Sequence, residues 1–191
     1  MEHHHFILYK PDGYLSQFVS QQTKRKNKKM LGELHDFPEG TMAIGRLDEQ
    51  SEGLLLLTTD GKVSEHIRSN KVEKEYYVQV DGIIDPKALE ILKSGIEIST
   101  NGGAYLTKPC SVMTLSEIPS FPPRRKKIRD ERHGPTSWIS ITLTEGKFRQ
   151  VRKMTAAIGF PTLRLIRVRI GHITLGKMLP KEVINVPTFS L

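Results

Sequence analysis

The segment that decides the fold runs from Gly45 to Gly61 and reads GRLDEQSEGLLLLTTDG. Its centre holds four consecutive leucines, Leu54–Leu57, followed by the turn-forming residues Thr58–Gly61. A short continuous apolar run that ends in turn residues is typical of a strand buried on both faces. The segment therefore predicts a central strand of a sheet with a tight turn after it.

One carboxylate, Asp48, lies just ahead of this apolar run and two residues after Arg46. An unpaired ion at the mouth of a buried strand costs free energy on the order of several kcal/mol, so we expect a cation partner. The spacing permits two interpretations. Asp48 either caps a turn or takes part in chemistry.

Composition favours a polyanionic partner. The chain has 191 residues, of which 37% are hydrophobic, so it can form one large domain or two small ones. Its formal net charge is +8, and basic residues gather at 24–29, 124–132 and 146–169. A single charge run is usually a solvated face, but three in one short chain favour nucleic-acid binding.

Several kinds of site and location are excluded by what the sequence lacks. Cys110 is the only cysteine, which rules out an intrachain disulfide and a thiolate-rich zinc site and fits a reducing compartment. No signal peptide or membrane-spanning run occurs, so we expect a cytoplasmic protein with no membrane partner. Metal-ligand spacing and a Gly-rich phosphate loop are missing, and His3–His5 are only weak evidence for metal binding. We expect no metal and no cofactor.

Local patterns predict the remaining elements. Strands are expected at 6–9, 76–84, 138–144 and 163–170, helices at 62–67, 86–94 and 151–158, short strands within 99–123, and loops at 21–29 and 119–135. Asp85–Pro86 is a typical helix start and Gly95 a typical helix end. Alternation in Trp138–Thr144 predicts one buried face, and a change of phase in the last strand predicts a bulge near Leu165–Ile166.

Three motifs resemble those of bacterial pseudouridine synthases that act on ribosomal RNA. They are GRLDEQSEGLLLLTTDG, KEY at Lys74–Tyr76, and EGKFRQVRKMTAAIGFPTLRLIRVRIG at Glu145–Gly171, and YKPDGYLSQF at Tyr9–Phe18 is similar to the family's opening motif. The motifs follow the family's order over nearly the whole chain. The likeness is strongest to members that modify large-subunit rRNA, in GPTSWISITL (Gly134–Leu143) and MTAAIGFPTLRLIR (Met154–Arg167).

The resemblance implies an α+β fold with a mixed, mainly antiparallel sheet, flanking helices and a central basic cleft. Residues 1–191 would form a single catalytic domain, with two subdomains flanking the cleft. Relatives often begin with a small RNA-binding module, and we expect no such separate module here because the motifs start within ten residues of the N-terminus.

The same resemblance implies roles for three residues. Asp48 would be the catalytic carboxylate, serving either as a nucleophile at the ribose or as a base that forms a glycal. Tyr76 would stack on the uracil and help remove the C5 proton, while Tyr77 faces the other side of its strand. Arg152 would hold Asp48 through two parallel hydrogen bonds. The alternatives are a core tyrosine and a phosphate-binding arginine.

The expected partner is large-subunit ribosomal RNA, free or in an assembly intermediate, bound by a monomer. Arg149 and Lys153, four apart, are expected on one helix face toward the RNA. The candidate RNA-binding residues are Arg46, Lys74, Lys24, Arg25, Lys26, Arg124, Arg125, Lys147, Arg149, Lys153, Arg164 and Arg167. Two other functions stay open: a synthase for small-subunit rRNA or tRNA, and a non-catalytic RNA-binding factor of ribosome assembly.

Overall fold

The computed structural model describes residues 2–19, 27–69 and 71–191. Its strands and α-helices in chain order are β1 (His5–Lys10), β2 (Met42–Ala43), β3 (Glu52–Thr58), α1 (Gly61–Arg68), β4 (Lys74–Asp81), α2 (Pro86–Ser94), β5 (Glu97–Thr100), β6 (Gly103–Leu106), β7 (Ser111–Thr114), β8 (Thr136–Leu143), α3 (Gln150–Ala157), β9 (Thr162–Ile170), β10 (Ile173–Thr174) and β11 (Val183–Val186). Two short 3-10 helices, Leu31–Glu33 and Glu131–His133, lie in connecting segments.

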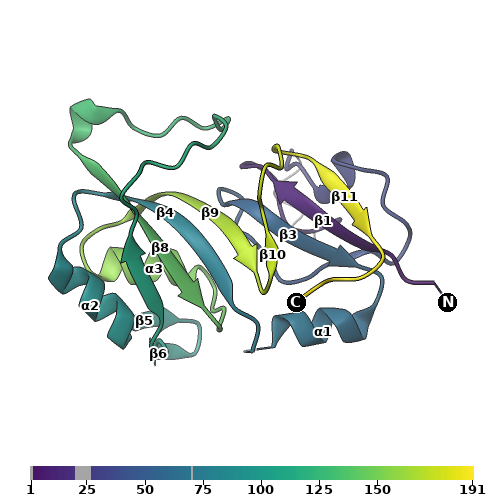
Figure 1. The fold of residues 1–191 in the computed structure, drawn as a ribbon, viewed down its shortest axis with the longest axis horizontal. Coiled ribbons are helices and arrows are strands. Elements are labelled where there is room, and N and C mark those ends of the chain that lie inside the picture. The colour runs from purple at the N-terminus through teal and green to yellow at the C-terminus, as the bar shows by residue number, and fades with distance from the viewer. Residues whose placement is uncertain (1, 20–26, 70) are drawn as a thin grey trace.

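Nine of the strands found in these residues form one mixed sheet, which confirms the predicted fold class. The order is β11-β1-β3-β9-β4-β8-β7, with β10 beside β9 and β2 beside β3. Neighbouring strands run antiparallel except β3 and β9, which are parallel. In Figure 1 β1, β3 and β11 form one side of the molecule, β4 and β8 form the other with helices α2 and α3, and β9 lies between them.

The parallel junction of β3 and β9 requires a glycine. Gly53 pairs with Arg167 there and has a φ of +102°, in the region that favours glycine. A Cβ at this position would lie 2.3 Å from the Arg167 carbonyl oxygen, so any side chain would force the strands apart. Gly53 therefore fixes how closely the two halves of the sheet approach.

The residues predicted to start and end the helices do so in the structure. The Asp60 side chain accepts a hydrogen bond from the Lys62 N–H at the start of α1, and Asp85 does the same for Ala88 at the start of α2. Gly95, with a φ of +101°, follows the end of α2. The three helices thus begin and end close to their predicted limits.

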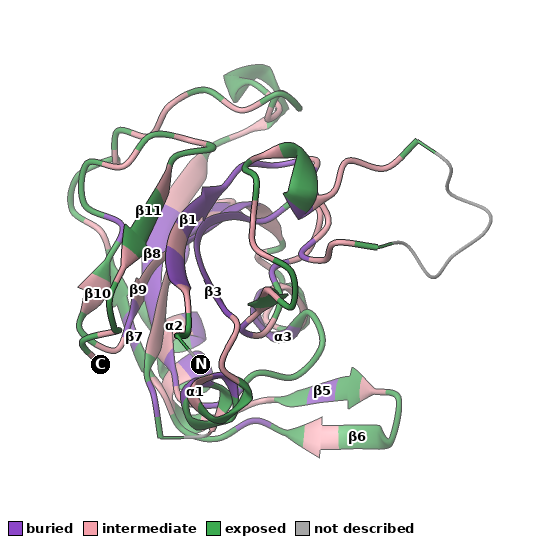
Figure 2. Cartoon of the chain, turned by 90° about the vertical axis from the view of Figure 1, so that its right-hand side faces the viewer, coloured by how far each residue is buried: buried purple, intermediate pink, exposed green. Residues whose placement is uncertain are grey.

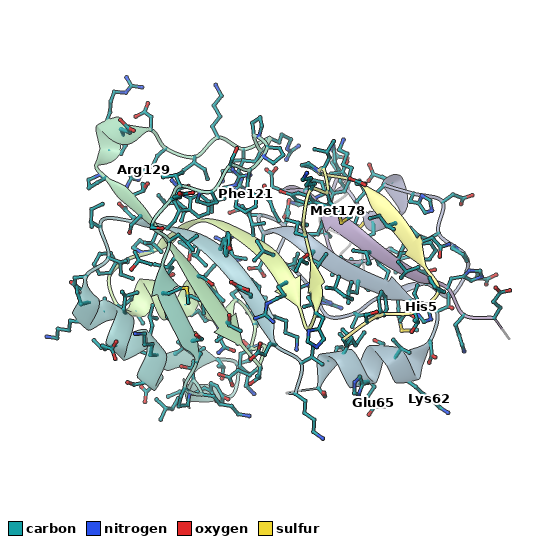
Figure 3. The ribbon with its side chains drawn as sticks, viewed as in Figure 1. His5, Lys62, Glu65, Phe121, Arg129 and Met178 are labelled. Atoms are coloured by element: carbon teal, nitrogen blue, oxygen red, sulfur yellow. The ribbon has the colours of Figure 1, made fainter. Side chains whose placement is uncertain are left out.

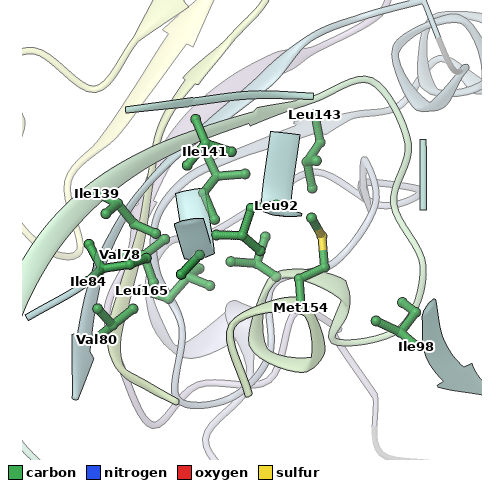
Figure 4. Close-up of a cluster of buried hydrophobic side chains, with 13 residues drawn as sticks. Val78, Val80, Ile84, Leu92, Ile98, Ile139, Ile141, Leu143, Met154 and Leu165 are labelled. Carbon is green, nitrogen blue, oxygen red and sulfur yellow. The ribbon is translucent and has the colours of Figure 1, made fainter. Parts of the chain in front are cut away.

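Apolar side chains cover both faces of the sheet. Leu54–Leu57 have no exposed surface, as expected for a strand buried on both faces. One cluster fills the space between the sheet and the helices α2 and α3, where Leu92 and Met154 meet Val78, Ile141 and Leu165 (Figure 4). A second cluster on the opposite face includes Trp138, Ile166 and Ile67 of α1.

Two details of the predicted strands are wrong. β8 was expected to bury one face, but Trp138 and Ser140, on its other face, are 7% and 4% exposed. Phe121 of the 119–135 segment lies 6.1 Å from Trp138 between ring centroids, and the Ser140 hydroxyl donates a hydrogen bond to Glu75. The bulge expected near Leu165–Ile166 is also absent from its predicted place. The register of β9 against β4 shifts at Leu163 and Val168 instead. Leu165 packs in the cluster on one face of the sheet and Ile166 in the cluster on the opposite face. Regular alternation along the strand therefore buries both side chains without a bulge between them.

Candidate active site

A pocket of about 270 Å³ lies where the two halves of the sheet meet. Its wall takes residues from the turn before β3, from α1, from β4 and β9, and from the turn between β8 and α3. The ionisable side chains in this wall are Arg46, Asp48, Arg68, Lys74, Tyr76, Glu145, Lys147, Arg149, Arg152 and Arg167. Seven of the ten are cations, so the predicted basic cleft is present.

Asp48 lies in this pocket with its carboxylate 23% exposed. Its backbone carbonyl accepts a hydrogen bond from the Ser51 N–H at 3.0 Å, which closes the turn ahead of β3. Its Oδ2 lies 3.2 Å from Nη1 of Arg149 and 3.4 Å from Nε of Arg152. Two guanidinium groups therefore face one carboxylate, and the group of three side chains keeps a net positive charge.

Arg152 of α3 reaches Asp48 from the interior side, with its side chain 11% exposed. Its Nη2 donates a hydrogen bond to the Ser51 hydroxyl at 3.0 Å, so the guanidinium bridges two points of the same turn. The two parallel hydrogen bonds expected between Arg152 and Asp48 are not formed, because one edge of the fork is used by Ser51. Burial lowers the pKa of Arg152, and the neighbouring Asp48 opposes that shift.

Arg149 has a different place from the one predicted. It was expected on a helix face with Lys153, but α3 begins at Gln150 and Arg149 is the residue before it, with a φ of +53°. A non-glycine residue in this left-handed region is uncommon and often marks a functional site. This conformation turns the Arg149 side chain toward Asp48, whereas Lys153 donates to the Ser99 carbonyl.

A buried carboxylate that the sequence reasoning missed holds this turn. Glu145 is 3% exposed and accepts hydrogen bonds from the Tyr105 hydroxyl at 2.5 Å, the Lys108 N–H at 2.8 Å and the Gln150 side-chain amide at 2.7 Å. Burial acts to raise the pKa of Glu145, but these hydrogen bonds hold it below its usual value. Gln150 in turn accepts from the Lys147 N–H at 2.9 Å.

Two of the partners of Glu145, Tyr105 and Lys108, come from the β5–β6 hairpin and the residues after it, which project from the same side of the sheet as α3 (Figure 2). The charged side chain of Lys147 also lies 4.5 Å from the Tyr105 ring centroid. The hairpin thus braces the turn that carries Arg149. The sequence signal for this contact is weak, because Tyr105 and Glu145 are 40 residues apart.

Another buried basic residue, Lys10, supports the turn on the opposite side. Lys10 has no exposed surface, and its Nζ donates to the carbonyls of Pro11 at 2.9 Å, Tyr14 at 2.8 Å and Glu49 at 3.4 Å. Burial lowers the pKa of Lys10 to about 7. Since Glu49 follows Asp48, Lys10 ties the Tyr9–Phe18 motif to the turn that carries the carboxylate.

Tyr76 and Tyr77 face opposite sides of β4. Tyr76 lines the pocket, and the Arg167 guanidinium carbon lies 6.0 Å from its ring centroid. Tyr77 lies on the other face, 6.2 Å from Phe121 between ring centroids. Lys74, two residues before Tyr76, lines the same pocket. Burial, with a smaller contribution from Arg167, lowers the pKa of Lys74 to about 8.

Several pocket cations have no carboxylate partner. In the part of the chain that the structure describes, Arg46, Lys74, Lys147 and Arg167 form no ion pair, and neither does Arg68 of α1, which the sequence reasoning missed. In the sequence, the only sign of Arg68 is its position at the end of a predicted amphipathic helix, which does not indicate a site. The pocket is therefore suited to an anion.

Arg164 and Arg124, which were expected to contact phosphates, are buried and paired with carboxylates in the structure. Arg164 is buried and donates to both oxygens of Glu52, at 2.9 and 2.8 Å, and to the Pro122 carbonyl at 2.8 Å. The Arg124 side chain is 5% exposed and lies 3.5 Å from Asp12 and 3.9 Å from Glu52. Both arginines instead fasten the 119–135 segment to the ends of β1 and β3.

The other candidate RNA-binding residues lie partly in the pocket wall, partly on the surface and partly outside the described residues. Arg167 is 5% exposed, donates to the Leu54 carbonyl at 2.8 Å and belongs to the pocket wall rather than to the surface. Arg125 is exposed, and Phe121 and Arg129 lie on the same segment, where Arg129 pairs with Asp81 (Figure 3). Lys24, Arg25 and Lys26 lie outside the described residues, as does most of the loop predicted at 21–29.

The described residues contain no group of three or more His, Cys, Asp or Glu side chains placed to hold a metal ion. None of the helices in those residues has both the length and the apolar character needed to cross a membrane.

The chain is similar to known proteins along most of its length. A sequence model of the family described as RNA pseudouridylate synthase matches residues 4–157. The ribosomal large subunit pseudouridine synthase E of Xanthomonas campestris pv. campestris is 42% identical over 178 residues, which cover 92% of this chain and 91% of that protein. The protein of the same name in Vibrio parahaemolyticus is 40% identical over 178 residues, covering 92% of this chain and 71% of that protein.

A solved structure shares the architecture. A crystal structure of a pseudouridylate synthase aligns with a TM-score of 0.74 and 27% identity, over 97% of this chain and 70% of that one. Its match extends over both halves of the sheet.

Proposed function

Since the chain belongs to the RNA pseudouridylate synthase family, we propose that it isomerises a uridine of large-subunit ribosomal RNA to pseudouridine. Both relatives described above are large-subunit synthases, and each aligns with 92% of the chain. The observation that carries the proposal is the Asp48 carboxylate, which lies 3.2 and 3.4 Å from two guanidinium groups in a pocket whose ionisable side chains are mostly cations.

The reaction exchanges one bond for another within a single nucleotide. The glycosidic bond between N1 and C1′ breaks, the uracil turns, a bond forms between C5 and C1′, the C5 proton leaves and N1 takes up a proton. We assign Asp48 to the ribose, where a carboxylate acts either as the nucleophile at C1′ or as the base that forms a glycal. Arg149 and Arg152 orient it.

Tyr76 is proposed to contact the base. Its ring lines the pocket that also holds Asp48, so an aromatic face is available to stack on uracil, and its hydroxyl can exchange a proton during removal of the C5 proton. Arg167 and Lys74 lie on the same side of the pocket as Tyr76. We assign them to the carbonyl oxygens or the adjoining phosphate of the bound nucleotide.

The cations without carboxylate partners are proposed to hold the RNA backbone. A uridine in folded RNA must leave its stack to enter a pocket, at a cost of about a few kcal/mol that backbone contacts offset. Arg46, Arg68 and Lys147 surround the pocket, and Lys24–Lys26 are proposed to extend the contact. We also propose that residues 1–191 act as one catalytic unit, with the two halves of the sheet flanking the cleft.

The proposal is tested by mapping pseudouridine in total RNA from cells that have or lack this protein. Loss of one pseudouridine from large-subunit rRNA, restored by the wild-type gene, is the expected result. Loss from small-subunit rRNA or tRNA instead would contradict the proposed target but keep the reaction. An unchanged map would contradict the reaction itself and favour a non-catalytic factor.

Replacing Arg152 by lysine is expected to lower kcat/KM about 100-fold or more, on the scale of losing one preorganised donor. Lysine keeps the charge but has no fork, so it cannot reach Asp48 and the Ser51 hydroxyl at once. Initial rates on rRNA from cells that lack the protein measure the effect. Arg132→Lys is the matched control, since the Arg132 side chain is 87% exposed and pairs with Asp130. If the Arg152→Lys variant kept the wild-type rate, the proposed role of Arg152 in orienting Asp48 would be wrong.

RNA affinity is expected to fall about 10-fold between pH 7 and pH 9, as the Lys74 ammonium loses its proton. The pKa of Lys74 is lowered to about 8, so its charge disappears within this range as the pH rises. Lys74→Arg keeps a charge throughout, and the difference between the two pH profiles of Kd measures the contribution of Lys74. Parallel profiles for the two proteins would show that Lys74 does not contact the RNA.

A further inference from the structure

Phe148 is a large aromatic side chain at the edge of the pocket. It lies in the turn between β8 and α3 and is 68% exposed. Its neighbours Lys147 and Arg149 line the pocket, whereas Phe148 is not part of the wall. The ring therefore projects outside the pocket, one residue from the arginine that contacts Asp48.

The turn presents this ring in a fixed place. Glu145 and Gln150 bind the two ends of the turn through buried hydrogen bonds, so the backbone on each side of Phe148 is held. The Lys153 ammonium lies 5.3 Å from the Phe148 ring centroid. Single exposed hydrophobic side chains are common. Phe148 differs from an exposed residue such as Leu179 in being aromatic, flanked by cations and adjacent to a nucleotide pocket.

The proposed reaction exposes a base that such a ring can bind. When the target uridine leaves its stack, the base next to it loses a stacking partner. Aromatic side chains replace that partner in many RNA-binding proteins, because every base offers a π face, and nearby cations hold the adjoining phosphate.

We propose that Phe148 is a stacking site for the unpaired base that adjoins the target uridine. This inference rests on the proposed function and adds a binding site outside the catalytic pocket. Because all four bases can stack on an aromatic ring, Phe148 raises the affinity for RNA and stabilises the opened RNA, and it contributes little to sequence selection.

The test compares variants that keep or lose the π face. Phe148→Tyr and Phe148→Trp keep it, whereas Phe148→Leu keeps apolar bulk without it. On rRNA from cells that lack the protein, Phe148→Leu is expected to lower kcat/KM roughly 5- to 100-fold, mainly through a higher KM, while the aromatic variants stay within a few-fold of wild type. Leu179→Ala, a change at a residue 63% exposed, is the control and leaves the rate unchanged.

A fluorescent base reports the stacking directly. A short rRNA fragment around the mapped uridine carries 2-aminopurine at each flanking position in turn, and binding is measured in an Asp48→Asn background so that the base is not converted. At one position the 2-aminopurine stays quenched with Phe148 and becomes brighter with Phe148→Leu. Equal fluorescence and equal kcat/KM for the two proteins would overturn the inference. If wild type forms no pseudouridine in the rRNA, there is no target uridine, so the proposed function fails and this inference fails with it. An active wild type with equal values for Phe148→Leu overturns the inference alone.

Discussion

Asp48→Asn is expected to lower pseudouridine formation at least about 10⁴-fold, the scale on which enzymes lose rate when a central catalytic group is removed. Asparagine has nearly the same shape, so the turn closed by the Asp48 carbonyl and the Ser51 N–H is retained. The amide is neither a nucleophile nor a base of comparable strength. Release of tritium from RNA that contains [5-³H]uridine measures the reaction, because the C5 proton is lost in every turnover.

RNA binding should survive the same change. Without the Asp48 charge, Arg149 and Arg152 lose their carboxylate partner and the pocket becomes more positive, so affinity for RNA is maintained or rises. Glu49→Gln is the matched control. Its carboxylate pairs with Lys28 at 2.5 Å, away from the pocket, and the variant keeps its activity. Equal losses of binding and activity in Asp48→Asn, or full rescue of the biological function by it, would contradict a catalytic role.

Arg164→Met is expected to lower the free energy of unfolding by about 3–5 kcal/mol, because it leaves the Glu52 carboxylate buried without its main partner. The Glu52 side chain is 3% exposed, and Arg124, at 3.9 Å, offers it only a distant charge. For a chain of this size the loss corresponds to a fall in Tm on the order of 10 °C, measured by thermal unfolding.

Two further variants separate this structural role from a phosphate contact. The double variant Glu52→Gln with Arg164→Met removes both charges and is expected to recover part of the lost stability. Arg125→Met, at an exposed arginine of the 119–135 segment, leaves Tm unchanged. If Arg164→Met weakened RNA binding while Tm stayed constant, the arginine would act on the RNA and not within the fold.

Most of the elements are encoded in short stretches of sequence, which is why they were predictable. Leu54–Leu57, the Asp85–Pro86 helix start and the glycine at 95 each act through neighbouring residues. The covered face of β8 is different. Its burial depends on Phe121, which a long connection brings onto Trp138, and no local pattern signals that contact.

The same distinction separates the predicted from the missed parts of the candidate site. Asp48, Tyr76 and Arg152 lie in motifs that resemble a family, and the structure brings all three to one pocket. Arg149 was assigned to a helix face because no neighbouring residue signals its left-handed backbone. The turn that carries Arg149 also depends on Glu145, one of whose hydrogen-bond partners lies 40 positions away. Arg164 was assigned to the surface because its partner, Glu52, is 112 positions away.

The place of β9 in the sheet makes the assembly of the candidate site depend on a strand that follows both of its neighbours in sequence. β9 is made after β3 and β4 yet lies between them, so the half of the sheet that carries Asp48 joins the half that carries Tyr76 only once β9 has been made. A nascent chain that ends before α3 has a carboxylate without its two arginines. A chain whose synthesis has not reached α3 and β9 therefore lacks the assembled pocket.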